Sequence, residues 1–347
     1  MPARIPRSHD LLLRLRILTA DDWNRVRFDP DDRRGHVESH FLKATSPDAN
    51  RAFWIKITFL SPKGRPGSAV AEAWAIAFER GKAPVGVKET VAAGAARFGT
   101  APMRLEVPGA LFCPPRTSGE LRNGARRIAW DLAFEGPGEP YAPFPSMRMY
   151  DGPLPRSKLV TPYPDLRFDG VVQVDDVRWE IGGWRGMQGH NWGRSHAARY
   201  AWAHCNAFED APAGTWLEGF TGQIRIGPLL TPKVTMVGLS LGGSRVRFDD
   251  LVGTLRREGS IAYYRWTFRA EQSGHRIEGE ARAEHRDLAG LRYENPSGAA
   301  SSCLNSKLAT MEVRYRAPAA QEIRLTSRAA ALEIGTHDED HGVETIL

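Results

Sequence analysis

Apolar residues recur at every second position through much of this chain of 347 residues. In residues 53–59, four large apolar side chains point to one side of an extended backbone, and Trp54, Lys56 and Thr58 point to the other. A period of two is that of a β-strand, and little of the sequence repeats with the period of a helix. The strands predicted on this basis are 53–59, 70–79, 127–136, 166–181, 233–241, 261–271 and 275–285. Clusters of Pro, Gly, Asn and Asp separate them, so the pattern indicates an all-β sandwich or barrel.

The middle of the chain holds a long segment without this alternation. Residues 135–165 are rich in proline, and we predict a long loop there, with strand structure resuming at Leu166. Residues 184–204 then bring together three tryptophans and three histidines among glycines. Glycine in such a pattern marks a bend or a close approach of the backbone, so we expect His190 and Trp192 to sit on backbone that can turn sharply.

The charge of the chain is modestly basic. A net charge of +6 arises from 47 basic and 41 acidic residues that are spread along the sequence. There is no Lys/Arg-rich block and no nucleic-acid motif, so we predict no nucleic-acid partner. The basic excess is compatible with a weak peripheral association with an anionic membrane. Phosphate-binding glycine motifs are absent as well, and we predict no cofactor.

Cysteine usage and the N-terminus suggest a location. The three cysteines, Cys113, Cys205 and Cys303, are odd in number and widely spaced, which favours free thiols in a reducing cytoplasm. The only apolar run near the start is interrupted by Arg14 and Arg16, and it is too short and too charged for a signal segment or a membrane span. We therefore expect a cytoplasmic protein.

Residues 199–207 read as a strand with two different faces. Tyr200, Trp202, His204 and Asn206 share one face, and small residues form the other. An aromatic face with a few hydrogen-bonding groups suits the wall of a mostly apolar pocket. Tryptophans of this kind are more often fillers of a hydrophobic core than walls of a binding site, so that alternative stays open.

A hairpin is predicted next to this strand. If the turn between it and residues 215–226 is centred near Ala211, His204 lies opposite Glu218, and Trp202 lies opposite Phe220. A His–Glu pair at that position would act as a proton relay, or it would be an ordinary cross-strand pair.

Further polar candidates lie near the N-terminus. His36, Glu38 and His40 alternate in sequence and so point the same way, either on a solvated edge or in a cluster at the mouth of a cavity. The histidines at 190, 196 and 204 have no HxH or HxxxH spacing, so we predict no metal site. A Ser–His–Asp hydrolase is not supported either, because no GxSxG motif occurs.

Several of these segments resemble a known family. The stretch "WRGMQGHNWG", preceded by "LRFDGVVQV", resembles the signature of the carotenoid 1,2-hydratase (hydroxyneurosporene synthase) group, which belongs to the AttH-like and tocopherol cyclase-like proteins of lipocalin type. "VESHFLKATSPDANRAFWIKITF" and "AVAEAWAIAFER" resemble its N-terminal strands, and "LRYENPSGAASSCLNSKLA" resembles its C-terminal region. The resemblance spans residues 20–315.

This resemblance carries implications for the fold and the site. It implies two calycin-like antiparallel β-barrels or half-barrels packed together, here assigned to residues 1–195 and 196–347, with the signature near their junction. It also implies a cofactor-free acid catalyst or a binder of an apolar molecule. Hydratase relatives place an aspartate before the signature histidine, whereas this chain has Gly189 before His190. Glu38, Glu218 or His190 itself would then replace the missing acid, or the chemistry differs.

We therefore expect an acid/base enzyme of the hydratase, cyclase or isomerase type, acting on an apolar, isoprenoid-like molecule in an aromatic-lined pocket near the domain junction. A non-catalytic, lipocalin-like carrier of an apolar ligand is the alternative. The candidate catalytic residues are His190, Glu218, Glu38 and His204. The candidate substrate-binding residues are Asn191, Trp192, Tyr200, Trp202, Trp184 and Lys158.

Overall fold

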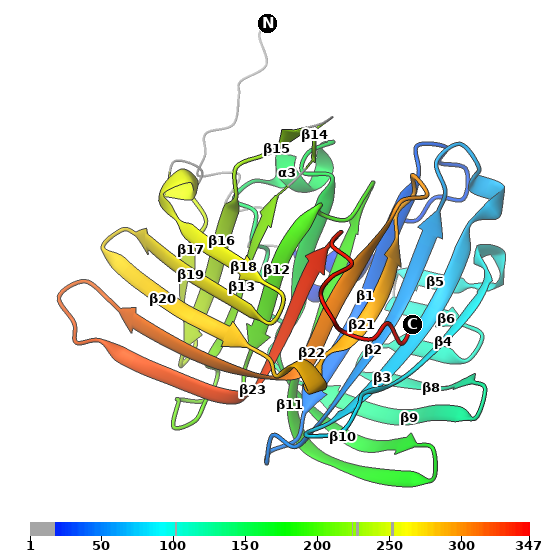
Figure 1. The fold of residues 1–347 in the computed structure, drawn as a ribbon, viewed down its shortest axis with the longest axis horizontal. Helices are drawn as coiled ribbons and strands as arrows, with labels where there is room; N and C mark the ends of the chain where they lie inside the picture. Colours follow the sequence, from blue (N-terminus) through cyan, green and yellow to red (C-terminus); the bar gives the residue numbers. More distant parts are fainter. Residues whose placement is uncertain (1–17, 101–102, 224, 227–228, 251–252) are drawn as a thin grey trace, which may run out of the picture.

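The protein is built almost entirely from antiparallel strands that form two large curved sheets standing side by side (Figure 1). The structure, a computed structural model, describes residues 18–100, 103–223, 225–226, 229–250 and 253–347. The all-β class and the pair of calycin-like half-barrels expected from the sequence are confirmed.

The first sheet has eleven strands in the order β4-β3-β2-β1-β11-β10-β9-β8-β7-β6-β5. Its strands are β1 (His36–Thr45), β2 (Arg51–Ser61), β3 (Val70–Glu79), β4 (Val85–Ala92), β5 (Arg97–Thr100), β6 (Met103–Val107), β7 (Ala110–Cys113), β8 (Arg116–Asn123), β9 (Arg126–Glu135), β10 (Ser157–Val174) and β11 (Val177–Gly193). Two short helices, α2 (Ala20–Asn24) and α3 (Met147–Asp151), accompany it.

The second sheet has ten strands, with the path β17-β16-β13-β12-β23-β22-β20-β19-β18 and β21 paired to β22. Its strands are β12 (Arg199–Cys205), β13 (Trp216–Gln223), β16 (Val234–Leu241), β17 (Ser244–Phe248), β18 (Glu258–Ala262), β19 (Arg265–Gln272), β20 (His275–Arg282), β21 (Ala289–Glu294), β22 (Ala300–Arg316) and β23 (Ile323–Thr336). A small hairpin of β14 (Arg225–Ile226) and β15 (Leu229–Leu230) stands apart. The chain leaves the first sheet at Gly193 and enters the second at Arg199, while the domain limits 1–195 and 196–347 stay a prediction.

Strand alternation sorts the apolar residues into separate layers. The predicted face of β2 that carries Phe53 and Ile55 packs into the core of the first sheet, and Trp54 on the opposite face packs into a cluster between the sheets. In β12 of the second sheet, Ala201 faces the core of that sheet, and Trp202 joins the same cluster between the sheets. One face of each of these strands therefore packs into the core of its own sheet, and the other face packs into the cluster between the two sheets.

Two predicted strands are in fact hairpins. Residues 166–181 turn at Asp175, which has a φ of 51°, so that β10 pairs with β11 across this point. Residues 261–271 turn between Ala262 and Arg265, which are paired. Both turns were missed because the alternation of apolar residues resumes directly after each of them; the first turn is marked only by Asp175 and Asp176, and the second, Tyr263 and Tyr264, contains no residue typical of a turn.

The region around His190 also differs from the prediction. Strand structure resumes at Ser157 rather than Leu166, and β11 runs without a turn to Gly193. Glycine serves close approach here: a Cβ at Gly186 would lie 2.0 Å from the carbonyl oxygen of Lys43. His190 therefore lies in a central strand, and its direction is set by that strand.

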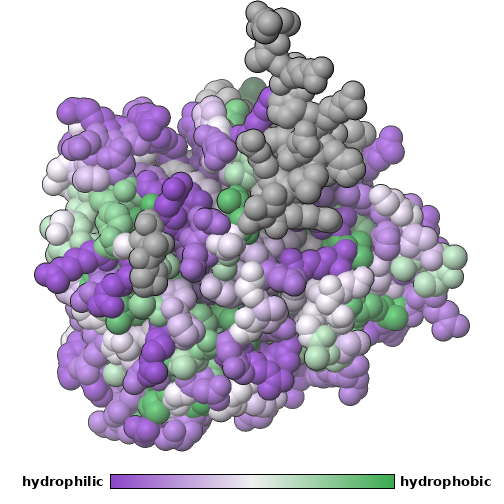
Figure 2. Space-filling model, turned by 180° about the vertical axis from the view of Figure 1, so that it is seen from behind, coloured by the Kyte–Doolittle hydropathy of each residue, from purple (hydrophilic) through white to green (hydrophobic). Residues whose placement is uncertain are grey.

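The surface and the helices complete the description. Figure 2 shows a face on which hydrophilic residues predominate, with small hydrophobic areas among them. No helix within the described residues combines the length and the apolar character needed to cross a bilayer. Cys113, Cys205 and Cys303 are free thiols.

Candidate functional site

A cavity of about 530 Å³ lies between the two sheets, and we call it the junction cavity. Its wall is largely aromatic and aliphatic, with a few polar groups. The lining residues are Phe41, Trp54, Lys56, Phe144, Met149, Leu154, Pro155, Ser157, Leu159, Asn191, His196, Ala197, Tyr200, Trp202, Phe220, Gly222, Gln223, Thr231, Val234, Met236, Tyr293 and Glu333. Residues from both sheets thus enclose one space, as a site for an apolar small molecule requires.

Three predicted site residues line the junction cavity, namely Asn191, Tyr200 and Trp202. Trp202 is only 5% exposed, and its indole meets the ring of Phe41 edge-on at 5.9 Å. Asn191 reaches the cavity because it lies on the face of β11 opposite to His190. The pleat of β11 therefore separates the predicted residues into two groups.

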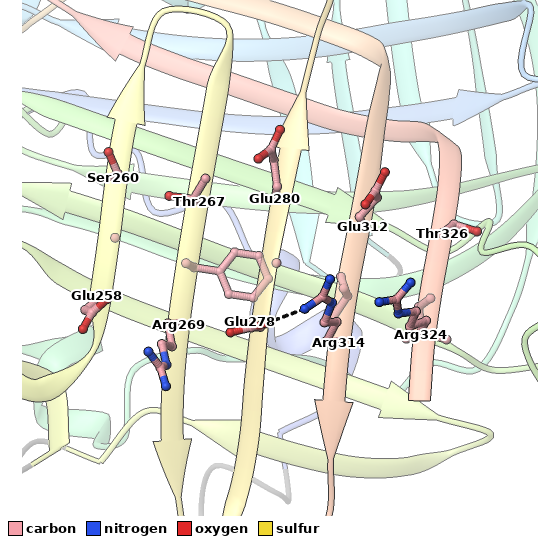
Figure 3. A pocket seen from close by; sticks show the side chains of 15 residues that line it. Glu258, Ser260, Thr267, Arg269, Glu278, Glu280, Glu312, Arg314, Arg324 and Thr326 are labelled. Carbon is pink, nitrogen blue, oxygen red and sulfur yellow. Dashed lines mark hydrogen bonds and ion pairs between the residues drawn. The ribbon is translucent and has the colours of Figure 1, made fainter. Parts of the chain in front are cut away.

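A second hollow lies on the outer face of the second sheet and differs in character. Figure 3 shows charged and hydroxyl side chains projecting from neighbouring strands, with Arg314 paired to Glu278 at 3.5 Å. Its polar side chains come from alternate positions that face away from the core, such as Glu258 and Arg269. This hollow is a solvated, charged sheet face and does not suit an apolar ligand.

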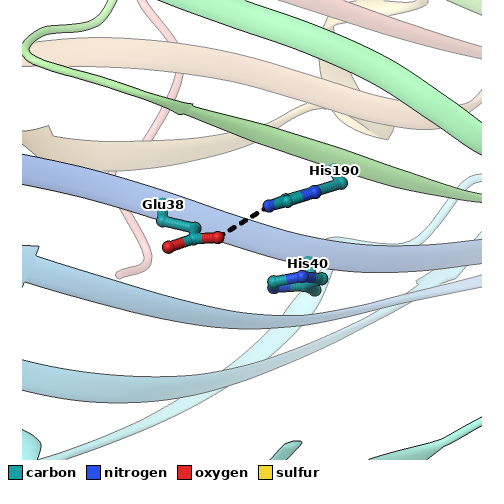
Figure 4. Close-up of side chains that lie close together, drawn as sticks. All are labelled: Glu38, His40 and His190. Carbon is teal, nitrogen blue, oxygen red and sulfur yellow. Dashed lines mark hydrogen bonds and ion pairs between the residues drawn. The ribbon is translucent and has the colours of Figure 1, made fainter. Parts of the chain in front are cut away.

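His190 belongs to a buried network inside the first half-barrel, which we call the Glu38 cluster. Glu38 lies on β1 and receives a hydrogen bond from His190 Nε2 at 2.9 Å (Figure 4). His36 Nε2 donates to Glu38 as well, also at 2.9 Å. The backbone N–H of Arg27 donates to both oxygens of Glu38, at 2.8 and 3.0 Å. Glu38 and His190 are both 0% exposed, so the polar triplet predicted from 36–40 is a buried cluster and not a solvated edge.

The partners of the Glu38 cluster define its protonation. His190 Nδ1 lies 2.6 Å from the carbonyl oxygen of Trp23, and its Nε2 faces Glu38, so both ring nitrogens meet acceptors. Burial opposes ionisation of Glu38, but the hydrogen bonds from His190 and His36 outweigh it and hold the pKa of Glu38 well below its ordinary value. Burial, together with the charge of Arg27, lowers the pKa of His190 despite its hydrogen bond to Glu38. We infer an ionised Glu38 that accepts a hydrogen bond from the Nε2–H of a neutral His190.

His40 packs against this pair without joining it. Its ring stacks on that of His190 with centroids 3.9 Å apart, and its Nε2 donates to the carbonyl oxygen of Asn24 at 2.9 Å. Burial lowers the pKa of His40 to about 3, which leaves the ring neutral. Glu38, His40 and His190 offer ligand atoms within 4.8 Å of one another. The Arg27 guanidinium lies only 3.4 Å from His190 Nδ1, however, and its charge would oppose a metal cation there.

The predicted register of the second hairpin is confirmed, but the proton relay is not formed. His204 is paired with Glu218, and Trp202 with Phe220. His204 Nε2 donates instead to the carbonyl oxygen of Pro164 at 2.8 Å, and Glu218 accepts from the indole N–H of Trp202 at 2.9 Å. Burial raises the pKa of Glu218 to about 7. Glu218 therefore supports the cavity wall from behind Trp202.

The three remaining predicted residues lie outside the junction cavity. Trp184 packs in the core of the first sheet, 6.1 Å from the ring of Phe53. Trp192 faces the Glu38 cluster, with the Arg27 guanidinium 3.8 Å above its ring. Lys158 is 6% exposed and donates to the carbonyl oxygen of Pro155 at 2.6 Å. Each of these three side chains lies outside the cavity because it points to the face of its strand that is turned away from the second sheet.

Several polar residues of the cavity wall were not predicted as site residues, among them Lys56, His196 and Tyr293. The Lys56 ammonium lies 3.9 Å from the centre of the Tyr293 ring, and the His196 ring lies 5.1 Å from that ring. Desolvation, with a smaller contribution from Lys56, lowers the pKa of His196 to about 3. The alternation of Trp54 and Lys56 on one face of β2 was visible in the sequence, but nothing there showed that this face meets a second sheet.

Comparison with known proteins places the chain among its relatives. The family model described as tocopherol cyclase-like matches residues 167–336, which include β11 with His190 and both strands of the hairpin that holds Trp202. The predicted family resemblance is confirmed. An uncharacterized protein of Mycobacterium tuberculosis, found in two strains, is 22% identical over 292 residues, which cover 80% of this chain and 81% of that protein.

Two solved structures share the fold of this chain. The crystal structure of a putative AttH from Nitrosomonas europaea matches with a TM-score of 0.55 and 13% identity, covering 90% of this chain and 97% of that one. The crystal structure of CghA with Sch210972 matches with a TM-score of 0.53 and 10% identity, covering 88% of this chain and 89% of that one. At such identities the likeness shows a common architecture.

Gly189, at the position where the family resemblance predicts an aspartate, lies against an aromatic ring of the cavity wall. A Cβ built on Gly189 would lie 2.3 Å from the ring of Phe41, which lines the junction cavity. We expect Gly189→Asp to lower the free energy of unfolding by about 1–3 kcal/mol because the new side chain and the ring compete for one space. Urea denaturation measures this loss. The double variant Gly189→Asp with Phe41→Ala should lose less stability than the sum of the two single variants, and purely additive losses would show that the two sites do not compete.

Proposed function

We propose that this chain is a cofactor-free acid/base enzyme of the hydratase, cyclase or isomerase type, acting on an apolar, isoprenoid-like small molecule in the junction cavity. The observation that carries the proposal is the cavity of about 530 Å³, whose wall is mainly aromatic and aliphatic with a small number of polar groups. Small-molecule sites in proteins occupy roughly 300–1,000 Å³ and have this composition. The tocopherol cyclase-like resemblance supports the same reaction class.

The cavity wall suits a reaction through a positively charged carbon. The faces of Trp202 and Tyr200 would stabilise a carbocation that forms on an alkene after protonation. Asn191 would orient a water molecule or a carbonyl group. Glu218, whose pKa burial raises to about 7, would hold a proton at neutral pH directly behind Trp202. The Glu38 cluster would act as a positioning element, because it fixes β11 from the side opposite to Asn191.

A specific observation favours a second candidate, a non-catalytic carrier of an apolar ligand. Glu38, His190 and Glu218 are each at most 1% exposed, and none of them lines the junction cavity. A carrier needs only the apolar wall and no proton donor. Direct proton transfer from His190 would require a ligand on the opposite face of β11, and its catalytic role stays a prediction.

Incorporation of deuterium from the solvent distinguishes an acid/base enzyme from a non-catalytic carrier. The protein is incubated in D₂O with a lipid extract of its source cells, and mass spectrometry follows deuterium in any compound that the protein retains. An acid/base enzyme that protonates carbon introduces deuterium there, and we expect Glu218→Gln to slow this by about 100-fold or more. Glu209→Gln changes an exposed glutamate in the turn that precedes β13, the strand of Glu218; it is the matched control and should leave the rate unchanged. Retention of a compound by the wild type without any deuterium would establish the carrier instead.

The expected partners and location are predictions of the same kind. We propose an apolar small-molecule ligand, no nucleic-acid partner, a weak peripheral association with anionic membranes and a cytoplasmic location. The basic excess of the sequence, 47 basic against 41 acidic residues, motivates the membrane association.

A further inference from the structure

Lys56 places a positive charge in the wall of the apolar junction cavity. The residue lies on β2, is 4% exposed, and points to the side of the strand that faces the second sheet. Its ammonium nitrogen lies 3.9 Å from the centre of the Tyr293 ring and 5.0 Å from that of Trp74. Aromatic faces therefore surround the charge and compensate part of its lost hydration.

This ammonium lacks an acceptor within the described parts of the chain: neither a hydrogen bond nor an ion pair of Lys56 is found among them. The other buried lysines either have an acceptor or lie outside the cavity wall. Lys307 is paired with Glu333 at 2.7 Å, and Lys158 donates to a backbone carbonyl. Lys43 also lacks a partner among the described residues, but it does not line the cavity. A buried charge without an acceptor is costly, so a ligand that supplies one would gain affinity.

The charges around Lys56 favour an anion. Glu333 is the one acidic residue in the described cavity wall, and Lys307 and Asn305 already occupy one of its oxygens, at 2.7 and 3.0 Å. The ring of His196 is neutral, as its lowered pKa indicates. Burial lowers the pKa of Lys56 to about 8, so the Lys56 amine is protonated in most molecules at pH 7. Lys56 therefore leaves this end of the cavity with a surplus of positive charge.

We propose that Lys56 anchors a carboxylate at the head of an otherwise apolar ligand in the junction cavity. This inference rests on the proposed function, since it assumes that the cavity binds an apolar molecule, and it adds the chemistry of the head group. The carboxylate would accept a hydrogen bond from the Lys56 ammonium, and the apolar body would lie against Trp54, Trp202 and Phe220.

Retinoic acid and retinol test the proposal because they share an isoprenoid body and differ in the head group. Isothermal titration calorimetry at pH 7 measures both with the full-length protein. We expect the wild type to bind retinoic acid about tenfold more tightly than retinol, the gain typical of a hydrogen bond to a charged group. Lys56→Met should abolish this preference and leave the affinity for retinol unchanged.

Lys88→Met is the matched control. Lys88 also lies over the Trp74 ring, at 4.3 Å, but it is paired with Glu72 at 3.0 Å and lies outside the cavity wall, so its loss should leave the preference intact. If Lys56→Met does not fold, Lys56→Gln removes the charge while keeping a polar head. Equal affinities of the wild type for acid and alcohol, or a preference that survives at Lys56→Met, would overturn the anchor while leaving the apolar site in place. Failure of the wild type to bind either retinoid would count against the proposed function as well.

Discussion

Replacing Glu38 with alanine is expected to lower the free energy of unfolding by about 3–5 kcal/mol, because each buried donor left without an acceptor costs roughly 1–3 kcal/mol. Glu38 is 0% exposed and accepts hydrogen bonds from His36, from His190 and from the backbone N–H of Arg27. Alanine leaves all three donors without an acceptor in a space that excludes water. Urea denaturation followed by tryptophan fluorescence measures the loss.

The matched control for this variant is Glu180→Ala. Glu180 also lies in the first sheet and pairs with Arg178 at 2.6 Å, but its side chain is 74% exposed. An exposed ion pair contributes roughly 0–1 kcal/mol, so the control should unfold almost like the wild type. A Glu38→Ala protein as stable as this control would mean that the Glu38 cluster does not hold β1 to β11.

Stability is expected to fall as the pH is lowered from about 6.5 towards 3, because buried histidines are neutral in the folded protein. His40 and His204 each donate from Nε2 to a backbone carbonyl, and the Nδ1 atom of each has no partner among the described residues. Burial lowers the pKa of His40 to about 3 and that of His204 well below its ordinary value. Below pH 6.5 the unfolded chain binds protons that these folded rings do not.

The expected loss of stability follows from the difference in proton binding between the folded and the unfolded chain. At pH 5, His40 alone should reduce the free energy of unfolding by about 2 kcal/mol relative to neutral pH, given an ordinary histidine pKa of about 6.5 in the unfolded chain. Urea denaturation at pH 7.5, 6 and 5 measures the decline. His40→Gln keeps an N–H for the carbonyl of Asn24 and cannot titrate, so its decline should be smaller by that amount. Equal wild-type stability at pH 7.5 and 5 would contradict the neutral state of these histidines.

The two faces of β11 show how far sequence reasoning reaches. The glycines around His190 predicted a sharply turning backbone, so His190, Asn191 and Trp192 were not assigned to strand faces, and the sequence did not show which of them meets a ligand. Both sides carry polar and aromatic groups, so residues of both were predicted as one site. The structure puts Asn191 in the junction cavity, and it puts His190 in a network with Glu38, 152 positions away in the sequence.

The sequence by itself determined the all-β class, the two faces of strands such as β2 and β12 and, given a turn near Ala211, the register of the hairpin that carries Trp202 and Glu218, because these depend on a period of two and on short turns. Only the tertiary structure decided that the Lys56 face of β2 is covered by a second sheet and that β1 lies beside β11. Such contacts join segments far apart in the chain, and the pattern within one strand is the same whether its second face meets water or another sheet.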